Sequence, residues 1–229
     1  MTMERRGVEC MADSVHATTV KTLFVDLASH QGCLACVEDD RVVASFPVDH
    51  RIDDAELMTH VEDLLSRAKW SYPDLTNIAC VVGPGGFTSL RVAVALANAM
   101  SHELGVPSVG VHLSDLYGTR IADYVLRNEN SEIRNSKSET IWLHSTKKNE
   151  LFIREVSAPE ARCITIDELK TTLKRGMWMG ELIPEHRTIV DAAGVTEAPL
   201  RPAEDILPAF LQQQMYKRQI LQPWYGRGW

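Results

Sequence analysis

The residues that point most directly to chemistry form the segment Gly83-Pro84-Gly85-Gly86-Phe87-Thr88-Ser89-Leu90-Arg91. This segment follows a short apolar run, residues 78–82, which is typical of a buried strand. Glycine permits positive φ and close backbone approach, and Pro84 restricts one φ, so we expect a tight, exposed turn. Replacing Gly85 by Val should destabilise this turn if the φ of Gly85 is positive. Thr88 or Ser89 can cap a helix that runs to about Glu103. Exposed amides at such a helix N-terminus favour anions or the carboxylates of a partner.

The residue patterns of several enzyme classes are missing from the sequence. The eight histidines lie at least ten positions apart, whereas a metal-binding pair on a helix needs a spacing near four. The chain has no G-x-S-x-G sequence, and its glycine turn lacks the lysine of a P-loop. Cys33 and Cys36 form a C-x-x-C, but residues three apart on a strand point to opposite faces, so we interpret both as structural. None of these motifs therefore marks a catalytic or metal site in this chain, although residues distant in sequence could still assemble one in space.

The order of the predicted elements indicates an α/β chain of two lobes. Strands and helices alternate along the chain, with hairpins at residues 33–48, across Asp39-Asp40, and at 140–156. We expect these two hairpins to occupy equivalent positions in the two lobes. The predicted strands are 21–27, 33–38, 41–48, 78–82, 107–111, 140–144, 151–156, one near Met177 and 187–190. The predicted helices are 54–68, 89–103, 113–126, 166–174 and 203–219.

Two helices of the first lobe have apolar patterns that suggest a protein interface. The helix at 54–68 follows Asp53-Asp54-Ala55-Glu56, which resembles a capping box, and it has one apolar face. The helix at 89–103 has a single narrow polar stripe, although a helix on one sheet needs an apolar stripe of only about 100°. This second helix is either covered on two sides by its own chain or presents apolar surface to a partner. The candidate interface residues are Leu57, Met58, Val61, Leu64, Leu65, Leu90, Val94 and Ala97.

At these positions the sequence resembles the TsaB (YeaZ) family. Residues 83–91 are similar to the family signature Gly-Pro-Gly-Ser-Phe-Thr-Gly-Leu-Arg. Residues 23–29, Leu-Phe-Val-Asp-Leu-Ala-Ser, look like its opening strand, and residues 208–212, Pro-Ala-Phe-Leu-Gln, look like its C-terminal Pro-x-Tyr-Leu-Arg. The order and spacing of the elements agree from about Lys21 to Met215. The departures from the family pattern are Gly86, Ser89, Ala93, Ala95, Ala99 and the segment His144-Ser145-Thr146, which replaces an Asp-Ala-Arg segment.

The resemblance implies an actin-like, Hsp70-like fold with two lobes, mixed sheets and no catalysis by the chain itself. It implies a noncatalytic subunit that docks the threonylcarbamoyl-transferring enzyme TsaD, so that the pair modifies the adenosine beside the tRNA anticodon. The ATPase TsaE is a further expected partner. The helices at 54–68 and 89–103 would pack on their counterparts in the partner as a four-helix contact, or on a second copy in a homodimer.

The resemblance also bears on nucleotide binding. In nucleotide-using relatives an aspartate at the position of Asp26 helps to hold metal-bound phosphate. A vestigial phosphate or nucleotide contact would involve Asp26, Gly83, Gly85, Gly86 and Thr88. Phosphate cradling usually needs a glycine-rich hairpin turn, and Asp39-Asp40 has no glycine, which favours a purely structural Asp26. We therefore expect no cofactor on this chain alone, with ATP or ADP and a metal held only in the complex.

Two other functional classes remain as alternatives. An active sugar or acetate-type kinase of the same superfamily is suggested by Asp26 and the glycine turn. A peptidase is disfavoured by the missing histidine pair and the missing nucleophile motifs. Hydrolysis of ATP by the isolated chain would favour the kinase.

Composition places bounds on partners and location. The net charge of −7 argues against strong tRNA binding by the chain alone, so we expect tRNA contact only through the complex. No apolar run reaches the roughly 20 residues of a membrane span, which predicts a cytoplasmic protein without membrane contact. We divide the chain into a flexible extension (1–20), an N-terminal lobe (21–112), a second lobe (113–206) and a C-terminal helix with an aromatic tail (207–229). The tail, residues 222–229, could fold onto its own lobe, stack on bases or anchor a partner.

Overall fold

The computed structural model describes residues 19–49, 54–127, 140–155, 157–173, 176–199 and 202–226. The first eighteen residues of the predicted N-terminal extension lie outside the described residues, as do Asp53 of the predicted capping box and the last three residues of the aromatic tail.

The first lobe is built on a five-stranded mixed sheet with the order β3-β2-β1-β4-β5. The first three strands are antiparallel neighbours, whereas β4 and β5 continue the sheet parallel to β1. The strands are β1 (Lys21–Asp26), β2 (Gln31–Glu38), β3 (Arg41–Asp49), β4 (Asn77–Gly83) and β5 (Ser108–His112). This mixed order places the carboxyl ends of β1 and β4 side by side.

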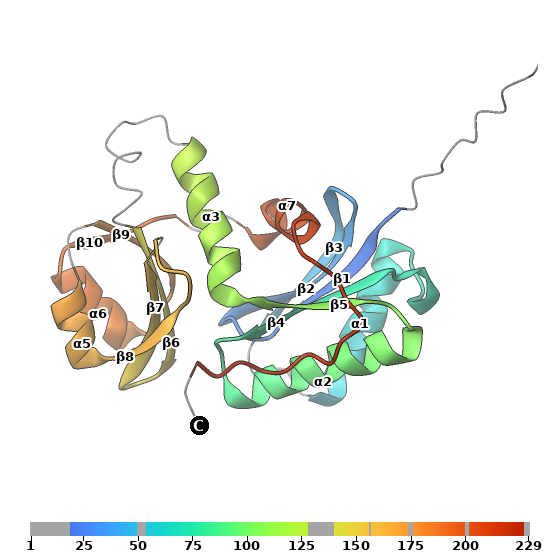
Figure 1. Ribbon diagram of the computed structural model, residues 1–229, viewed down its shortest axis with the longest axis horizontal. Coiled ribbons are helices and arrows are strands. Elements are labelled where there is room, and N and C mark those ends of the chain that lie inside the picture. Colours follow the sequence, from blue (N-terminus) through green and yellow to red (C-terminus); the bar gives the residue numbers. More distant parts are fainter. Residues whose placement is uncertain are drawn as a thin grey trace, which may run out of the picture.

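Alternation along the strands gives this sheet two apolar faces. Leu23 and Val25 of β1 pack in the cluster that includes α1 and α2, whereas Phe24 packs in the cluster that includes α3 and α7. Helices therefore cover both faces, as Figure 1 shows. They are α1 (Asp54–Ala68), α2 (Phe87–Leu104), α3 (Leu113–Arg127) and α7 (Leu207–Gln212), with short 3-10 turns η1 (Tyr72–Asp74) and η3 (Ala203–Asp205).

The second lobe repeats this strand pattern on a smaller scale. Its sheet has the order β10-β9-β6-β7-β8, with β6 antiparallel to β7 and parallel to β9. The elements are β6 (Thr140–Lys147), β7 (Glu150–Glu155), β8 (Arg162–Thr165), α5 (Ile166–Thr172), β9 (Gly176–Glu181), α6 (Pro184–Ala192) and β10 (Val195–Glu197). The predicted class, two lobes with mixed sheets, is confirmed.

The predicted equivalence of the two hairpins is wrong by one strand. β6 takes the central position that β1 takes in the first sheet, because both pair with the next strand along the chain and with a parallel neighbour. The hairpin at 140–156 therefore corresponds to β1–β2, and the counterpart of the hairpin at 33–48 is β7–β8. The first strand of each lobe and its neighbours have similar apolar content. The local pattern therefore does not show which strand takes the central position in the sheet.

Two predicted elements near the C-terminus also differ from the structure. Residues 187–190 belong to helix α6, which starts at Pro184 and buries His186 and Val190 four positions apart. The predicted helix over 203–219 is helical only at 203–205 and 207–212. Farther along the chain, backbone groups of Lys217 and Trp224 form hydrogen bonds with strands of the first lobe and not within a helix.

The C-terminal segment, residues 213–226, returns to the first lobe and runs along α2 (Figure 1). The backbones of Lys217 and Ser108 exchange hydrogen bonds of 2.8 and 3.1 Å. The Asn98 side chain donates to the carbonyl of Leu221 (3.0 Å) and accepts from its amide (2.8 Å). Helix α2 is thus covered on two sides by its own chain, which accounts for part of its wide apolar circumference.

Candidate functional site

Two turns meet at the carboxyl ends of β1 and β4, the edge of a parallel sheet at which ligands commonly bind. The first turn, residues 27–30, links β1 to β2, and the second, residues 83–86, links β4 to α2. A side chain at Gly85 would place its Cβ 2.8 Å from Cα of Ala28, so the two backbones touch. The structure thus brings together the candidate residues Asp26 and Gly85 from distant parts of the sequence.

Asp26 is buried and bonds to its own turn. Its carboxylate accepts hydrogen bonds from the amides of Ala28 (2.9 Å) and Ser29 (3.1 Å) and from the Ser29 hydroxyl (2.6 Å). Burial raises the pKa of Asp26 in spite of these hydrogen bonds. The carboxylate therefore caps local backbone, as the structural interpretation predicted.

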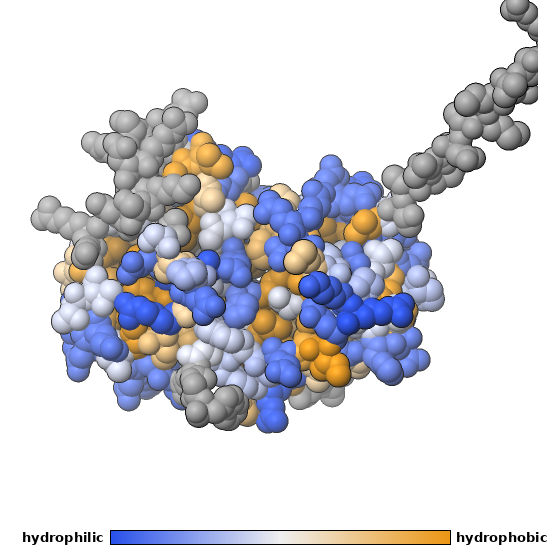
Figure 2. Space-filling model, viewed as in Figure 1, coloured by the Kyte–Doolittle hydropathy of each residue, from blue (hydrophilic) through white to orange (hydrophobic). Residues whose placement is uncertain are grey.

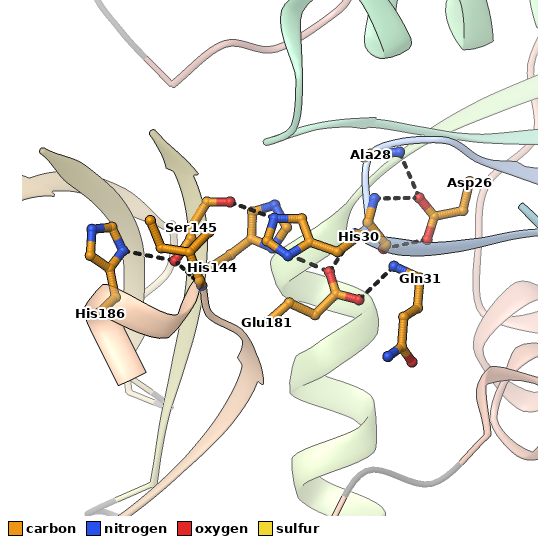
Figure 3. A network of polar contacts seen from close by, with 10 residues as sticks. Asp26, Ala28, His30, Gln31, His144, Ser145, Glu181 and His186 are labelled. Carbon is orange, nitrogen blue, oxygen red and sulfur yellow. Dashed lines mark hydrogen bonds and ion pairs between the residues drawn. The ribbon is translucent and has the colours of Figure 1, made fainter. Parts of the chain in front are cut away.

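A second carboxylate reaches the same turn from the other lobe. Glu181, the last residue of β9, accepts from the amides of His30 (2.8 Å) and Gln31 (3.0 Å), as Figure 3 shows. Nδ1 of His144 lies 3.4 Å from its Oε2 atom. Burial by itself raises the pKa of Glu181, but the His144 ring and the two amides outweigh it and lower the pKa to about 2.

Four successive amides of the turn therefore donate to carboxylates of the same chain. Ala28 and Ser29 donate to Asp26, and His30 and Gln31 donate to Glu181. Such a run of backbone N–H groups is the kind of concavity that binds an anion. Here its donors are already used by the protein.

The turn Asp39-Asp40 is not part of this site. The register pairs Asp26 with Cys33 and Lys21 with Glu38, so Asp39 follows the end of β2 that lies farthest from Asp26. Using Asp39-Asp40 to judge phosphate binding was therefore wrong, because the relevant turn is the one between β1 and β2.

The glycine turn differs from its prediction in three ways. Gly83 has a positive φ of 144°, whereas Gly85 is constrained by its contact with Ala28. Gly83 and Pro84 are buried, Gly85 is half-buried and Gly86 is exposed. The N-cap of α2 is Gly86, without a side-chain cap, because Phe87 already begins the helix. Thr88 and Ser89 thus lie inside the first turn and do not cap it.

The C-terminal tail explains the conformation of Gly83. A Cβ atom at this position would overlap the carbonyl oxygen of Trp224, and the Trp224 amide donates to Val82 (2.7 Å). The Trp224 ring also packs against His112 and Phe152, with centroids at 4.8 and 5.8 Å, so it touches both lobes. The described part of the tail, residues 222–226, folds onto its own chain.

Most of the predicted interface residues lie in the core of the first lobe. Ala97 is 0% exposed, and the six other buried candidates are at most 4% exposed: Leu57, Val61, Leu64, Leu65, Leu90 and Val94. Only Met58, at 42%, is exposed. The expected apolar patch is therefore absent at these seven positions, because the residues chosen are the ones that face the sheet.

The outward faces of α1 and α2 carry other residues. Thr88, Ala95 and Ala99 of α2 are exposed, while Val92 and Leu96 between them are half-buried. At the start of this face Phe87 is 56% exposed, stacks on Tyr225 (centroids 5.0 Å apart) and lies under Arg91. Figure 2 shows apolar surface beside polar side chains along the lower edge of the view, where α2 lies in Figure 1.

A serine–histidine pair in the second lobe was missed by sequence reasoning. The Ser145 hydroxyl accepts from the amide of Ile183 (3.1 Å) and lies 2.8 Å from Nδ1 of His186, to which it donates when the ring is neutral, because Nε2 then carries the ring proton. Nε2 of His186 donates to the carbonyl of Lys148 (2.8 Å). Both side chains are 1% exposed, and a substrate cannot reach the hydroxyl. The departure from the family pattern at His144-Ser145-Thr146 was the feature of the sequence that could have pointed to this pair. In the structure, Ser145 and His144 make contacts within the second lobe and with the first lobe.

Within the part of the chain that the structure describes, no group of three or more His, Cys, Asp and Glu side chains could hold a metal ion. None of the described helices is both long enough and apolar enough to span a bilayer.

Comparison with known proteins identifies relatives of this chain. Residues 51–119 match the model of the TsaD family, described as tRNA N6-adenosine threonylcarbamoyltransferase. The tRNA threonylcarbamoyladenosine biosynthesis protein TsaB of Buchnera aphidicola is 24% identical over 162 residues, covering 68% of this chain and 72% of that protein. TsaB of Escherichia coli is 27% identical over 92 residues, which is 40% of either chain.

The chain thus resembles TsaB proteins in sequence and a YeaZ-like protein in fold. A crystal structure from Pseudomonas aeruginosa, described as an uncharacterized protein with similarity to peptidase YEAZ, has the same fold. It superposes with a TM-score of 0.66 at 20% identity and covers 91% of this chain and 100% of its own. The segment that matches the TsaD family contains β4 and both outward-facing helices, α1 and α2.

We predict that Glu181 makes stability depend on pH in the acid range. Its folded pKa of about 2 lies below its ordinary value of 4.5, so its contribution is present above pH 4.5 and is lost as the pH falls to 2. The full effect corresponds to about 3 kcal/mol of unfolding free energy. Urea unfolding at several pH values between 5 and 2 should show a smaller loss for Glu181→Gln than for the unmodified chain.

The raised pKa of Asp26 acts in the opposite direction, so the comparison with Glu181→Gln isolates Glu181. Glu185→Gln, four residues away on an exposed side chain, should retain the pH dependence of the unmodified protein. If the unfolding free energy falls equally steeply with pH in all three proteins, the pKa of Glu181 is not lowered by folding.

Proposed function

We propose that this chain is an assembly subunit in the biosynthesis of tRNA threonylcarbamoyladenosine, without catalysis of its own, that docks a TsaD-like catalytic subunit. The observation that carries the proposal is the pair of TsaB relatives together with the TsaD-family match over 51–119. Because this segment contains α1 and α2, the chain and a TsaD-like subunit would share the same two helices. Like surfaces can pair about a twofold or near-twofold axis.

The docking surface of the proposed complex is the outward face of α1 and α2. Exposed Ala95 and Ala99 leave room for a partner helix to approach closely, and half-buried Val92 and Leu96 add apolar area. Exposed Met58 of α1 extends this surface. The same face would support a homodimer when the catalytic subunit is absent. A TsaE-like ATPase would join the assembled pair, and tRNA would be contacted only through the complex.

We predict that Ala99→Glu weakens binding of a TsaD-like subunit by about 100-fold or more, because an unpaired charge is forced into a closely packed helix contact. Ala99 is exposed, so the variant should fold normally. The measurement is titration calorimetry with the TsaD-like subunit of the same organism.

The matched control is Ala192→Glu, an exposed alanine at the end of α6 in the second lobe. This control should bind like the unmodified chain. If Ala95→Glu and Ala99→Glu both bind with unchanged affinity, the outward face of α2 is not the docking surface.

The kinase alternative needs anion-binding donors at the β1–β2 turn. The four amides at 28–31 all donate to Asp26 and Glu181, which speaks against phosphate binding there. We therefore expect the purified chain to show no ATP hydrolysis above background, with any nucleotide and metal held by the complex. Robust turnover by the monomer would favour the kinase.

A further inference from the structure

The junction between the lobes is crossed by hydrogen bonds that centre on the β1–β2 turn. From the second lobe, Glu181 accepts the amides of His30 and Gln31 at 2.8 and 3.0 Å. In the other direction, Nε2 of His30 lies 2.8 Å from the carbonyl oxygen of Ser145. A carbonyl can only accept, so this ring nitrogen donates. One residue of the turn therefore bonds to both β6 and β9 (Figure 3).

The surroundings of Glu181 strengthen these hydrogen bonds. The residue is 9% exposed, and the His144 ring beside it is 1% exposed, so water does not compete strongly for the carboxylate. The His144 ring in turn stacks parallel to Trp142, with ring centroids 5.7 Å apart. Its centroid lies 5.1 Å from that of the His30 ring. Hydrogen bonds to an ionised acceptor in such a site are stronger than neutral ones.

The Glu181 carboxylate lies where a bound anion would accept hydrogen bonds from the turn. Successive backbone N–H groups in a turn form a concavity for anions. Two of the four donors, those of Ala28 and Ser29, are taken by Asp26 of the same lobe, and the other two are satisfied from the second lobe. Glu181 is 150 residues away in sequence and supplies this anion from the opposite lobe.

We propose that Glu181 is a built-in anion that latches the two lobes together by occupying the His30–Gln31 amide pair, so that the junction is closed without any bound ligand. This inference goes beyond the proposed assembly function, because it concerns the isolated chain. The latch presents the second lobe in one orientation and leaves the turn unable to take an external phosphate.

Other contacts between the lobes do not replace the latch. Arg154 of β7 pairs with Asp115 and Ser114 of α3, and Trp224 packs between Val82 and Phe152. These contacts lie on other elements and satisfy none of the four turn amides. Loss of Glu181 should therefore expose the amides of His30 and Gln31 while the lobes themselves stay folded.

The test is amide hydrogen exchange measured by NMR on the full chain. In Glu181→Ala the amides of His30 and Gln31 should exchange about 10- to 100-fold faster, because each loses a charge-assisted hydrogen bond. The amides of Val25 and Cys80 in the central strands should keep their protection. Glu185→Ala, on an exposed side chain of α6, is the matched control and should leave all four amides unchanged.

Two results would overturn the proposal. One is unchanged exchange of His30 and Gln31 in Glu181→Ala. The other is a shift of these two amide resonances when inorganic phosphate is titrated into the unmodified protein, since an occupied site cannot respond. If Glu181→Ala lowers protection throughout the chain, Glu181→Gln decides the question. Its volume is retained, but the two amides bond to different carboxylate oxygens, and glutamine keeps an acceptor at only one of those positions. At least one of the two amides must then exchange faster for the latch to stand.

Discussion

The Ala97→Glu variant is expected to be largely unfolded, although Ala99→Glu, two residues along the same helix, is expected to fold. Ala97 is fully buried in the cluster that α1 and α2 form with the first sheet. A glutamate there must leave an unpaired charge in an apolar core or push α2 off the sheet. An uncompensated buried charge costs about 4 kcal/mol or more, a large part of the roughly 5–15 kcal/mol that keeps an ordinary domain folded.

Thermal unfolding followed by circular dichroism would measure this effect. Ala97→Glu should lose its cooperative transition, whereas Ala99→Glu should melt within a few degrees of the unmodified protein, because Ala99 is exposed. Comparable melting of both variants would mean that the face of α2 turned toward the sheet has been assigned incorrectly. The pair also separates folding from docking, since only a folded Ala99→Glu protein can report on partner binding.

The Gly83→Ala variant is expected to lose about 3 kcal/mol of unfolding free energy and to release the C-terminal tail. The new Cβ would overlap the carbonyl oxygen of Trp224, and the positive φ of 144° is one that side chains rarely adopt. The amide of Trp224, which donates to Val82, should lose its exchange protection. Urea unfolding and amide exchange at Trp224 measure the two effects separately.

Gly86→Ala is the matched control for this prediction. Gly86 has a φ of −62°, and its nearest neighbour to a new Cβ would be the Ser89 hydroxyl at 3.3 Å. Its replacement should change the unfolding free energy by less than about 1 kcal/mol. Equal losses for the two variants would show that the turn as a whole resists substitution and that the Trp224 contact is not the reason.

The latch and the docking surface lie on different parts of the molecule. Glu181 acts at the junction of the lobes, whereas Ala95 and Ala99 lie on the outward side of α2. A chain whose lobes are latched without ligand would offer a partner the same shape at all times. This suits a subunit that positions another protein better than one that opens and closes around a nucleotide.

Local pattern by itself determined much of the fold. Alternation and glycine punctuation located the five strands of the first sheet and β6, β7 and β9 of the second, but not β8 and β10. The segment at 83–91 pointed to the TsaB relatives. Each of these signals depends on neighbours in sequence. The prediction that Cys33 and Cys36 point to opposite faces is confirmed, since Cys33 packs in the cluster with α3 and α7 and Cys36 in the cluster with α1 and α2. Successive side chains of a strand alternate between its two faces, and this alternation alone predicts the result.

Only the tertiary structure decided which face of α2 meets the sheet. Apolar residues lie almost all round this helix, so its pattern has no single inward direction. The C-terminal segment settles part of the question, because Asn98 bonds to the backbone of Leu221 and turns one side of the helix toward its own chain. Glu181 likewise meets His30 only because two sheets are packed with their strand ends together. Contacts between residues so far apart leave no periodic trace in sequence, since each depends on where another element has already been placed.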